Sequence, residues 1–110
     1  MYTRFVETTS KHGKVRELCQ TIDENVLPIL RKQEGFVDEL VMVSESEPNR
    51  VIALSFWKTK EDAERYDREQ FDNVKKTIQH LFEDEPDVQT FNIQTSTAHR
   101  ITAEKVKKAA

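Results

Sequence analysis

Residues 51–57, with the sequence VIALSFW, constrain the fold more than any other part of this chain. They predict a β-strand, because β-branched and aromatic residues are enriched in strands. Nearly every position is apolar, so apolar side chains point to both faces of the sheet, and such a strand needs a cover on each face. Helices of the same chain can cover one face. We expect a second copy of the protein to cover the other.

The segments around this strand switch between two periodicities. Stretches rich in β-branched and aromatic residues predict strands, and apolar steps of three and four residues predict amphipathic helices. The predicted elements are strand 2–9, helix 14–33, strand 36–44, strand 50–57, helix 59–82 and strand 88–97.

The first predicted helix has one internal irregularity and a defined end. Its apolar stripe consists of Val15, Leu18, Cys19, Ile22, Val26, Ile29 and Leu30. Pro28 lacks a backbone N–H and clashes with the carbonyl four residues earlier, which predicts a kink or a fresh helical turn there. Gly35 supplies the helix stop.

The second predicted helix begins with a capping box formed by Thr59 and Asp62. Its apolar stripe runs to about Phe82, but the step from Tyr66 to Phe71 is five residues, which predicts a local irregularity near residues 68–70. Pro86 excludes any continuation of the helix.

The order β-α-β-β-α-β is that of the ferredoxin-like fold, an α+β arrangement. It places two helices on one face of a four-stranded antiparallel sheet and leaves the other face open. Residues 51–57 put apolar side chains on that open face, and a two-fold homodimer would bury them. The alternative is a small, tolerated apolar patch. We assign residues 1–97 to the domain and residues 98–110 to a polar tail, whose helix-prone end (103–110) is either frayed or docked on a partner.

Composition argues against several classes of partner. The net charge is −3, and no basic stripe with interleaved aromatics suggests a nucleic-acid partner. Residues 50–57 also lack the basic-Gly-Phe motif of RNA-binding domains of the same fold. No apolar run is long enough to span a membrane. No secretory signal is visible, and the single cysteine cannot form an intrachain disulfide, so a cytoplasmic location is expected.

Spacing alone assigns no chemistry to the chain. The three histidines, His12, His80 and His99, lack metal-ligand spacing, so no metal site is expected. Tyr66 and His80 are separated by nearly four helical turns and share a face if the helix is unbroken. His80 is then either a base or haem ligand, or a boundary residue with one solvated nitrogen.

Three further side chains have two interpretations each. Arg4 either anchors an anionic ligand or reaches solvent along its own stem. Either Trp57 or Phe56 lines whatever cavity lies under the helices, as core or as a ligand platform. Cys19 is an inert small hydrophobe or a reactive thiol, and burial among apolar neighbours favours the first.

The segments PILRKQEGFVDELVMVSE and RVIALSFWKTKEDAERY resemble the antibiotic-biosynthesis monooxygenase domain, one of the dimeric α/β-barrel families. The matching pattern is a first helix that ends before a Gly-Phe pair, a hairpin, and a Trp-x-Ser/Thr at the start of the second helix. The residues that carry it are Pro28, Gly35, Phe36, Trp57, Thr59, Ala63 and Tyr66. The likeness covers about residues 1–97.

The resemblance implies a homodimer whose sheets face each other, with a pocket between sheet and helices in each subunit. Some relatives oxidise polyphenolic or quinol substrates with molecular oxygen and without metal or flavin, so it implies no cofactor and a small aromatic ligand. In such a site Trp57 and Phe82 would form the pocket wall and Arg4 would bind the substrate. Tyr66 and His80 would handle the proton.

The chain also departs from its relatives. Haem-degrading members use an Asn, a Trp and a His, where this chain has Glu7 or Thr8, Tyr66, and Lys75 or Lys76. Haem degradation is therefore not expected. Many members carry a histidine at the place of Tyr66. The alternative function is a non-catalytic homodimeric module that binds a small apolar ligand or only assembles, and it predicts a closed or wholly apolar cavity.

Overall fold

The computed structural model describes residues 1–102 of the chain. The tail end at residues 103–110, predicted to be helix-prone, lies outside the described residues. The elements are β1 (Tyr2–Thr9), α1 (Val15–Thr21), a π-helical turn (Ile22–Val26), α2 (Leu27–Arg31), β2 (Phe36–Val43), β3 (Arg50–Trp57), α3 (Lys60–Glu69), α4 (Phe71–Ile78), a 3₁₀ turn (Gln79–Leu81) and β4 (Asp87–Asn92).

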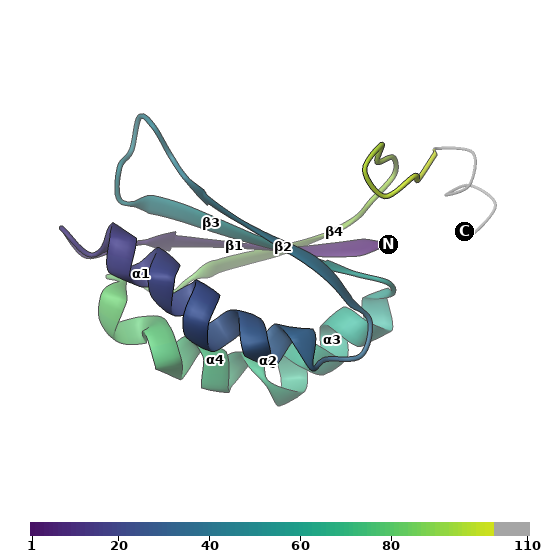
Figure 1. Ribbon diagram of the computed structural model, residues 1–110, viewed down its shortest axis with the longest axis horizontal. Helices are drawn as coiled ribbons and strands as arrows, with labels where there is room; N and C mark the ends of the chain where they lie inside the picture. Colours follow the sequence, from purple (N-terminus) through teal and green to yellow (C-terminus); the bar gives the residue numbers. More distant parts are fainter. Residues whose placement is uncertain (103–110) are drawn as a thin grey trace.

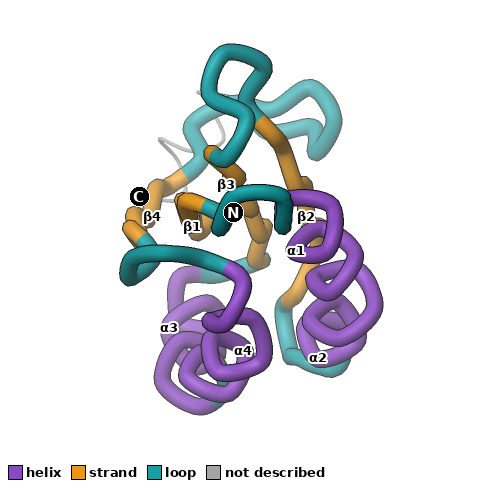
Figure 2. The backbone as a smooth tube through the Cα atoms, turned by 90° about the vertical axis from the view of Figure 1, so that its left-hand side faces the viewer, coloured by secondary structure: helices purple, strands orange, loops and turns teal. Residues whose placement is uncertain are grey.

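The four strands form one antiparallel sheet in the order β2-β3-β1-β4. All the helices lie against one face of it, with α1 and α2 beneath β2 and with α3 and α4 side by side with them (Figures 1 and 2). This arrangement confirms the predicted ferredoxin-like α+β fold. Alternation along β3 turns Val51, Ser55 and Trp57 towards the helices, where all three are buried.

The first helical segment is continuous, and its irregularity lies before Pro28. The N–H of Leu27 donates to the carbonyl of Ile22, five residues back, which widens one turn into a π-helix. The buried side chains of this segment follow one another at steps of four: Leu18, Ile22, Val26 and Leu30. Three α-helical turns take about 11 residues, so this span holds about one residue too many. The wide turn absorbs that residue and keeps all four side chains on one face.

The second helical segment breaks where the spacing predicted. Gln70, with φ −124° and ψ −25°, separates α3 from α4, and the break lets both Tyr66 and Phe71 face the sheet. At the start of α3 the predicted cap is present, since the N–H of Asp62 donates to Thr59 Oγ1 at 3.1 Å. The Asp62 carboxylate accepts from Arg65 at 2.9 Å.

The last strand is shorter than predicted and ends at Asn92. Asn92 pairs with Tyr2, and the N–H of Ile93 donates to the carbonyl of Met1, so β1 offers no further residue with which 94–97 could pair. The chain instead forms a small turn closed by hydrogen bonds between Ser96 and Ile101. The His99 ring, from the segment assigned to the tail, lies 5.2 Å from the ring of Phe56.

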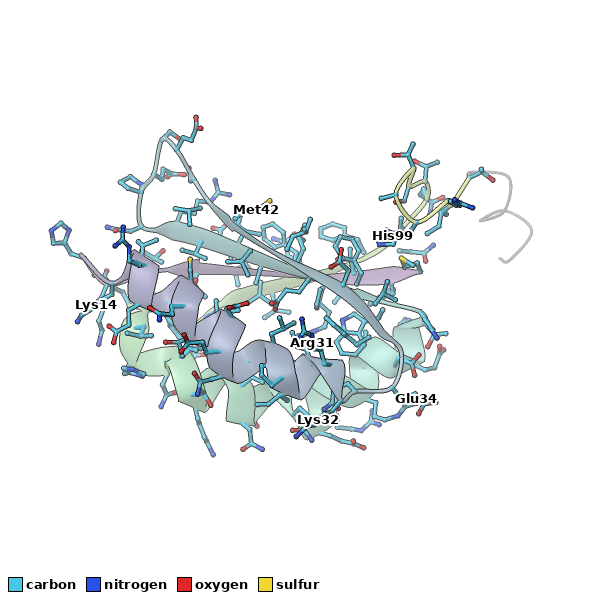
Figure 3. All side chains as sticks on the ribbon, viewed as in Figure 1. Lys14, Arg31, Lys32, Glu34, Met42 and His99 are labelled. Carbon is cyan, nitrogen blue, oxygen red and sulfur yellow. The ribbon has the colours of Figure 1, made fainter. Side chains whose placement is uncertain are left out.

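The sheet face opposite the helices carries exposed apolar side chains. Leu40, Met42 and Phe91 are 45%, 41% and 48% exposed, and Phe5 packs edge-on against Phe91. Met42 and His99 both lie on this side of the sheet (Figure 3). Among residues 1–102, no helix is long and apolar enough to cross a membrane.

Candidate functional site

A stack of aromatic rings and one buried cation lies between the sheet and α3. The Trp57 and Tyr66 rings stack with their centroids 5.0 Å apart, and both side chains are buried. The Arg4 guanidinium carbon lies 5.1 Å from the centroid of the Tyr66 ring and 4.4 Å from that of Phe71. These distances suit cation–π attraction, which holds Arg4 between two aromatic faces.

Arg4 is 2% exposed, so it does not reach solvent along its stem. Its Nη2 donates to Asp67 Oδ1 at 2.7 Å, and Asp67 itself is more than half exposed. The buried positive charge is thereby balanced from the protein surface, which lowers the desolvation penalty of the pair. The guanidinium remains next to the Tyr66 ring in an otherwise apolar setting.

Trp57 positions Tyr66 from the side of the sheet. The indole N–H donates to Ser55 Oγ at 2.9 Å, and the ring is completely buried between Phe36 and Tyr66. Burial of this kind satisfies the one polar atom of the indole and fixes its orientation. Trp57 therefore holds the Tyr66 ring in place, and no part of its surface is open to a ligand.

The Tyr66 hydroxyl keeps its proton at neutral pH. Burial raises the pKa of Tyr66 to about 12, with Arg4 acting in the opposite direction and Glu39 adding to the rise. A neutral phenol can donate a hydrogen bond to a bound oxygen atom. It does not act as a base near pH 7.

An inner cavity of about 50 Å³ adjoins Tyr66. Most of its lining is apolar, and its polar members are Arg4, Glu39, Ser55 and Tyr66. One water molecule needs about 10–15 Å³ by this measure, so the cavity has room for only a few waters. Ligand pockets are typically about 300–1,000 Å³, so an aromatic ligand needs space beyond it.

A groove of about 470 Å³ lies next to this cavity, between the α1–α2 segment and the edge strand β2. It is lined by Cys19, Asp23, Leu27, Arg31, Phe36, Val37, Asp38, Glu39 and Val41. Arg31 projects from α2 into the space beneath the sheet (Figure 3). Burial raises the pKa of the Cys19 thiol, so the neutral thiol is favoured on this wall.

Glu39 lines both the groove and the inner cavity. Its side chain is half-buried on the helix-facing side of β2, and no side chain among residues 1–102 donates a hydrogen bond to its carboxylate. Burial raises the pKa of Glu39 to about 7, and the carboxylates of Asp23 and Asp38 add to the rise. Glu39 therefore changes charge near neutral pH, unlike Tyr66.

The sequence matches the family model described as antibiotic biosynthesis monooxygenase over residues 1–76, which is more than half of the chain. The chain belongs to this family. A comparison with curated proteins gives no match.

Solved structures show the same fold. A monooxygenase from the ActVA-Orf6 gene of Streptomyces coelicolor, in complex with nanaomycin D, superposes with a TM-score of 0.75 at 11% identity, covering 86% of this chain and 88% of that chain. SnoaB, a cofactor-independent oxygenase from Streptomyces nogalater, gives 0.69 at 15% identity, covering 87% and 96%. A conserved protein from Methanosarcina mazei gives 0.64 at 23% identity, covering 84% and 92%.

The structure of this antibiotic biosynthesis monooxygenase family member brings together three of the five residues singled out from sequence, Arg4, Trp57 and Tyr66. Phe82 and His80 lie elsewhere. Trp57 is paired with Tyr2 at one end of β1, whereas Phe82 bridges Ser10, beyond the other end. At about 3.3 Å per residue these ends are roughly 26 Å apart.

The break at Gln70 and the 3₁₀ turn after Ile78 explain why His80 does not join Tyr66. The two helical irregularities destroy the register that placed both on one face, so His80 is exposed while Tyr66 is buried. Within residues 1–102, no group of three or more His, Cys, Asp or Glu side chains is arranged to hold a metal ion.

Glu39 is a site residue that was not predicted from the sequence. The signal was available, because alternation places Val37, Glu39 and Val41 on one face of a strand. An acidic residue between two valines on the inward face departs from the apolar pattern, and such a position suggests a functional group.

Proposed function

We propose that this chain is a cofactor-independent monooxygenase that oxidises a small aromatic or quinol-like substrate with molecular oxygen. One observation carries the proposal: a neutral buried phenol, Tyr66, a buried cation, Arg4, and a titrating carboxylate, Glu39, line one largely apolar cavity. Membership of the monooxygenase family supports it.

The reaction needs no external reductant. A phenol with hydrogen at the para carbon and one oxygen molecule give a quinone and one water, since the substrate supplies all four electrons that reduce oxygen. Two substrate hydrogens, from O–H and C–H, leave in the water. The substrate anion is the species that gives electrons to oxygen, so the protein has to favour that anion.

The residues of the site have separate parts in this scheme. Arg4 supplies positive charge in a low-dielectric setting, where it favours a developing phenolate more than it would in water. Tyr66 donates a hydrogen bond to a substrate oxygen. Trp57, stacked on Tyr66 from the side of the sheet, holds it in position.

The proposal includes a homodimer formed through the open face of the sheet. The exposed Leu40, Met42 and Phe91 lie there, with Phe5 packed against Phe91. Apolar groups gathered on one face of a small domain are typical of an interface, and a two-fold axis would bury the same patch on both copies.

A non-catalytic ligand-binding or assembly module is the second candidate. The small volume of the inner cavity, about 50 Å³, favours it. The lining does not, because this alternative expects a closed or wholly apolar cavity and Arg4, Glu39 and Tyr66 are all part of the wall.

Oxygen uptake with dihydroxynaphthalenes that carry hydrogen para to one hydroxyl tests the proposal. We expect one oxygen molecule consumed per quinone formed, with no oxygen returned on adding catalase, and a loss of rate in Tyr66→Phe. Tyr2→Phe serves as the matched control, because Tyr2 is only partly buried and does not line the inner cavity. An absence of turnover over the substrate panel would reject the oxygenase and leave the binding module.

A further inference from the structure

Glu39 is the one carboxylate among residues 1–102 that lines both the groove outside β2 and the cavity beside Tyr66. The groove has the volume for an aromatic ring system and opens to solvent, whereas the cavity does not have that volume. A planar substrate lying in the groove would therefore meet Glu39 at the point where the two spaces join.

The carboxylate of Glu39 is available to react. Three other acidic side chains near the site accept hydrogen bonds: Asp67 from Arg4, Asp62 from Arg65, and Asp38 from the backbone N–H of Glu39. Within residues 1–102, Glu39 has no hydrogen-bond donor and no ion pair. Its strand pairs with β3, and Glu39 lies opposite Ser55.

We infer that Glu39 is the catalytic base of this site, taking the hydroxyl proton of an aromatic substrate bound in the groove between β2 and the α1–α2 segment. In this step the substrate O–H bond breaks, its electron pair remains on oxygen to give the phenolate, and the proton bonds to a Glu39 carboxylate oxygen. No oxidant takes part in the step. The proton leaves later with the departing oxygen as water forms, which restores Glu39. The inference rests on the proposed oxygenase function.

The electrostatic surroundings of Glu39 suit a base that works near neutral pH. The charged and titratable groups that face it come from every neighbouring element: Arg4 on β1, Cys19 on α1, Asp23 on the π-helical turn, Arg31 on α2, Asp38 on β2 and Tyr66 on α3. Burial, followed by the charges of the two aspartates, makes the Glu39 anion less favourable and a stronger base. The raised pKa places its charge change near the pH at which a base is most effective.

Steady-state oxygen uptake with a dihydroxynaphthalene, followed from about pH 5 to about pH 9, tests the inference. For the natural chain we expect kcat/KM to rise with pH through the neutral range. In Glu39→Gln, which keeps the shape of the side chain, kcat should fall by about 10²–10⁴-fold. The rise of kcat/KM through the neutral range, here called the neutral limb, should disappear. Glu45→Gln, an exposed glutamate in the β2–β3 turn, should leave rate and profile unchanged.

A second variant separates a base from a residue that merely supports the fold. Asp23→Asn removes a neighbouring negative charge that raises the pKa of Glu39, so it should move the neutral limb to lower pH, whatever the effect on the rate itself. A purely structural role for Glu39 would not move that limb.

An anaerobic calorimetric titration with a naphthol completes the design, because it reports binding without turnover. Binding to Glu39→Gln with an affinity close to that of the natural chain, together with the lost limb, supports the inference. Turnover by Glu39→Gln at the rate and pH dependence of the natural chain would overturn it and leave the oxygenase proposal standing. Naphthol binding with no oxygen uptake by the natural chain would overturn both.

Discussion

Gly35 connects α2 to β2, and replacing it with alanine should destabilise the protein for two separable reasons. Its φ of +82° lies in the left-handed region, which costs a residue with a Cβ about 1–2 kcal/mol. An added Cβ would also lie 2.6 Å from the Cβ of Asp62, which is closer than two non-bonded carbon atoms come in proteins. The contact includes the rigid base of the Asp62 side chain, so rotating its tip away does not relieve it.

The second effect adds the cost of moving the start of α3. Displacing Asp62 disturbs its N–H bond to Thr59 and its ion pair with Arg65. Overpacking of this kind costs about 1–3 kcal/mol, which brings the expected loss for Gly35→Ala to about 2–5 kcal/mol.

Gly13→Ala is the matched control, because Gly13 has a similar φ of +74° and no heavy atom within 4 Å of an added Cβ. It should lose only the conformational part, about 1–2 kcal/mol. Urea unfolding followed by the fluorescence of Trp57, the single tryptophan, gives both values at one fixed protein concentration. Equal losses in the two variants would refute the argument from the Asp62 contact.

Three further predictions follow from charge and burial. Burial raises the folded-state pKa of Glu39 from 4.5 to about 7, so its stabilising contribution is full below about pH 4.5 and is lost as pH rises through 7. Between about pH 5 and 8 the free energy of unfolding of the natural chain should fall by about 1 kcal/mol relative to that of Glu39→Gln, after allowing for solvent screening. Parallel curves of stability against pH for the two proteins would contradict this. Asp67→Asn leaves the buried Arg4 without its carboxylate and should lower the free energy of unfolding by about 1–2 kcal/mol. Glu85→Gln removes only a surface ion pair and should lower it by less than about 1 kcal/mol. Urea unfolding measures both losses, and equal losses would show that burial of Arg4 adds nothing. Leu54 pairs with Phe5 and Leu40 on the open sheet face. Leu54→Glu should shift the proposed homodimer to monomer in analytical ultracentrifugation, and an unchanged mass would contradict the proposed interface.

Much of the fold was predictable because its signals are local. The alternation in residues 36–57 and the cap at Thr59 each act over a few residues, and all the predicted strands and helices are present. The fresh helical turn predicted at Pro28 is present, since α2 begins at Leu27 with Pro28 in its first turn. The π-helical turn before it, Ile22–Val26, was not predicted, because only the local clash of Pro28 was considered. The four-residue steps from Leu18 to Leu30 contained the better signal.

The site was harder to predict, because its members come together only through tertiary packing. Arg4 and Tyr66 meet because β1 and α3 pack together, which no spacing in the sequence reports. His80 is separated from Tyr66 by the break at Gln70; the break was predicted, and the shared face was expected only for an unbroken helix. A side chain beyond a helix irregularity is hard to place from sequence, because a shift of one residue rotates it by about 100° about the helix axis.

The rotation of about 100° per residue also links the π-helical turn to Glu39, the proposed base. Without the extra residue, the helix before Leu27 would turn by about 100° relative to the helix after it. Ile22 and Val26, which line the inner cavity, and Asp23, which lines the groove, would not keep their present places together. These residues supply the burial and the negative charge that raise the pKa of Glu39. The wide turn therefore does more than accommodate the spacing of the core residues: it sets the environment in which Glu39 gains and loses its proton.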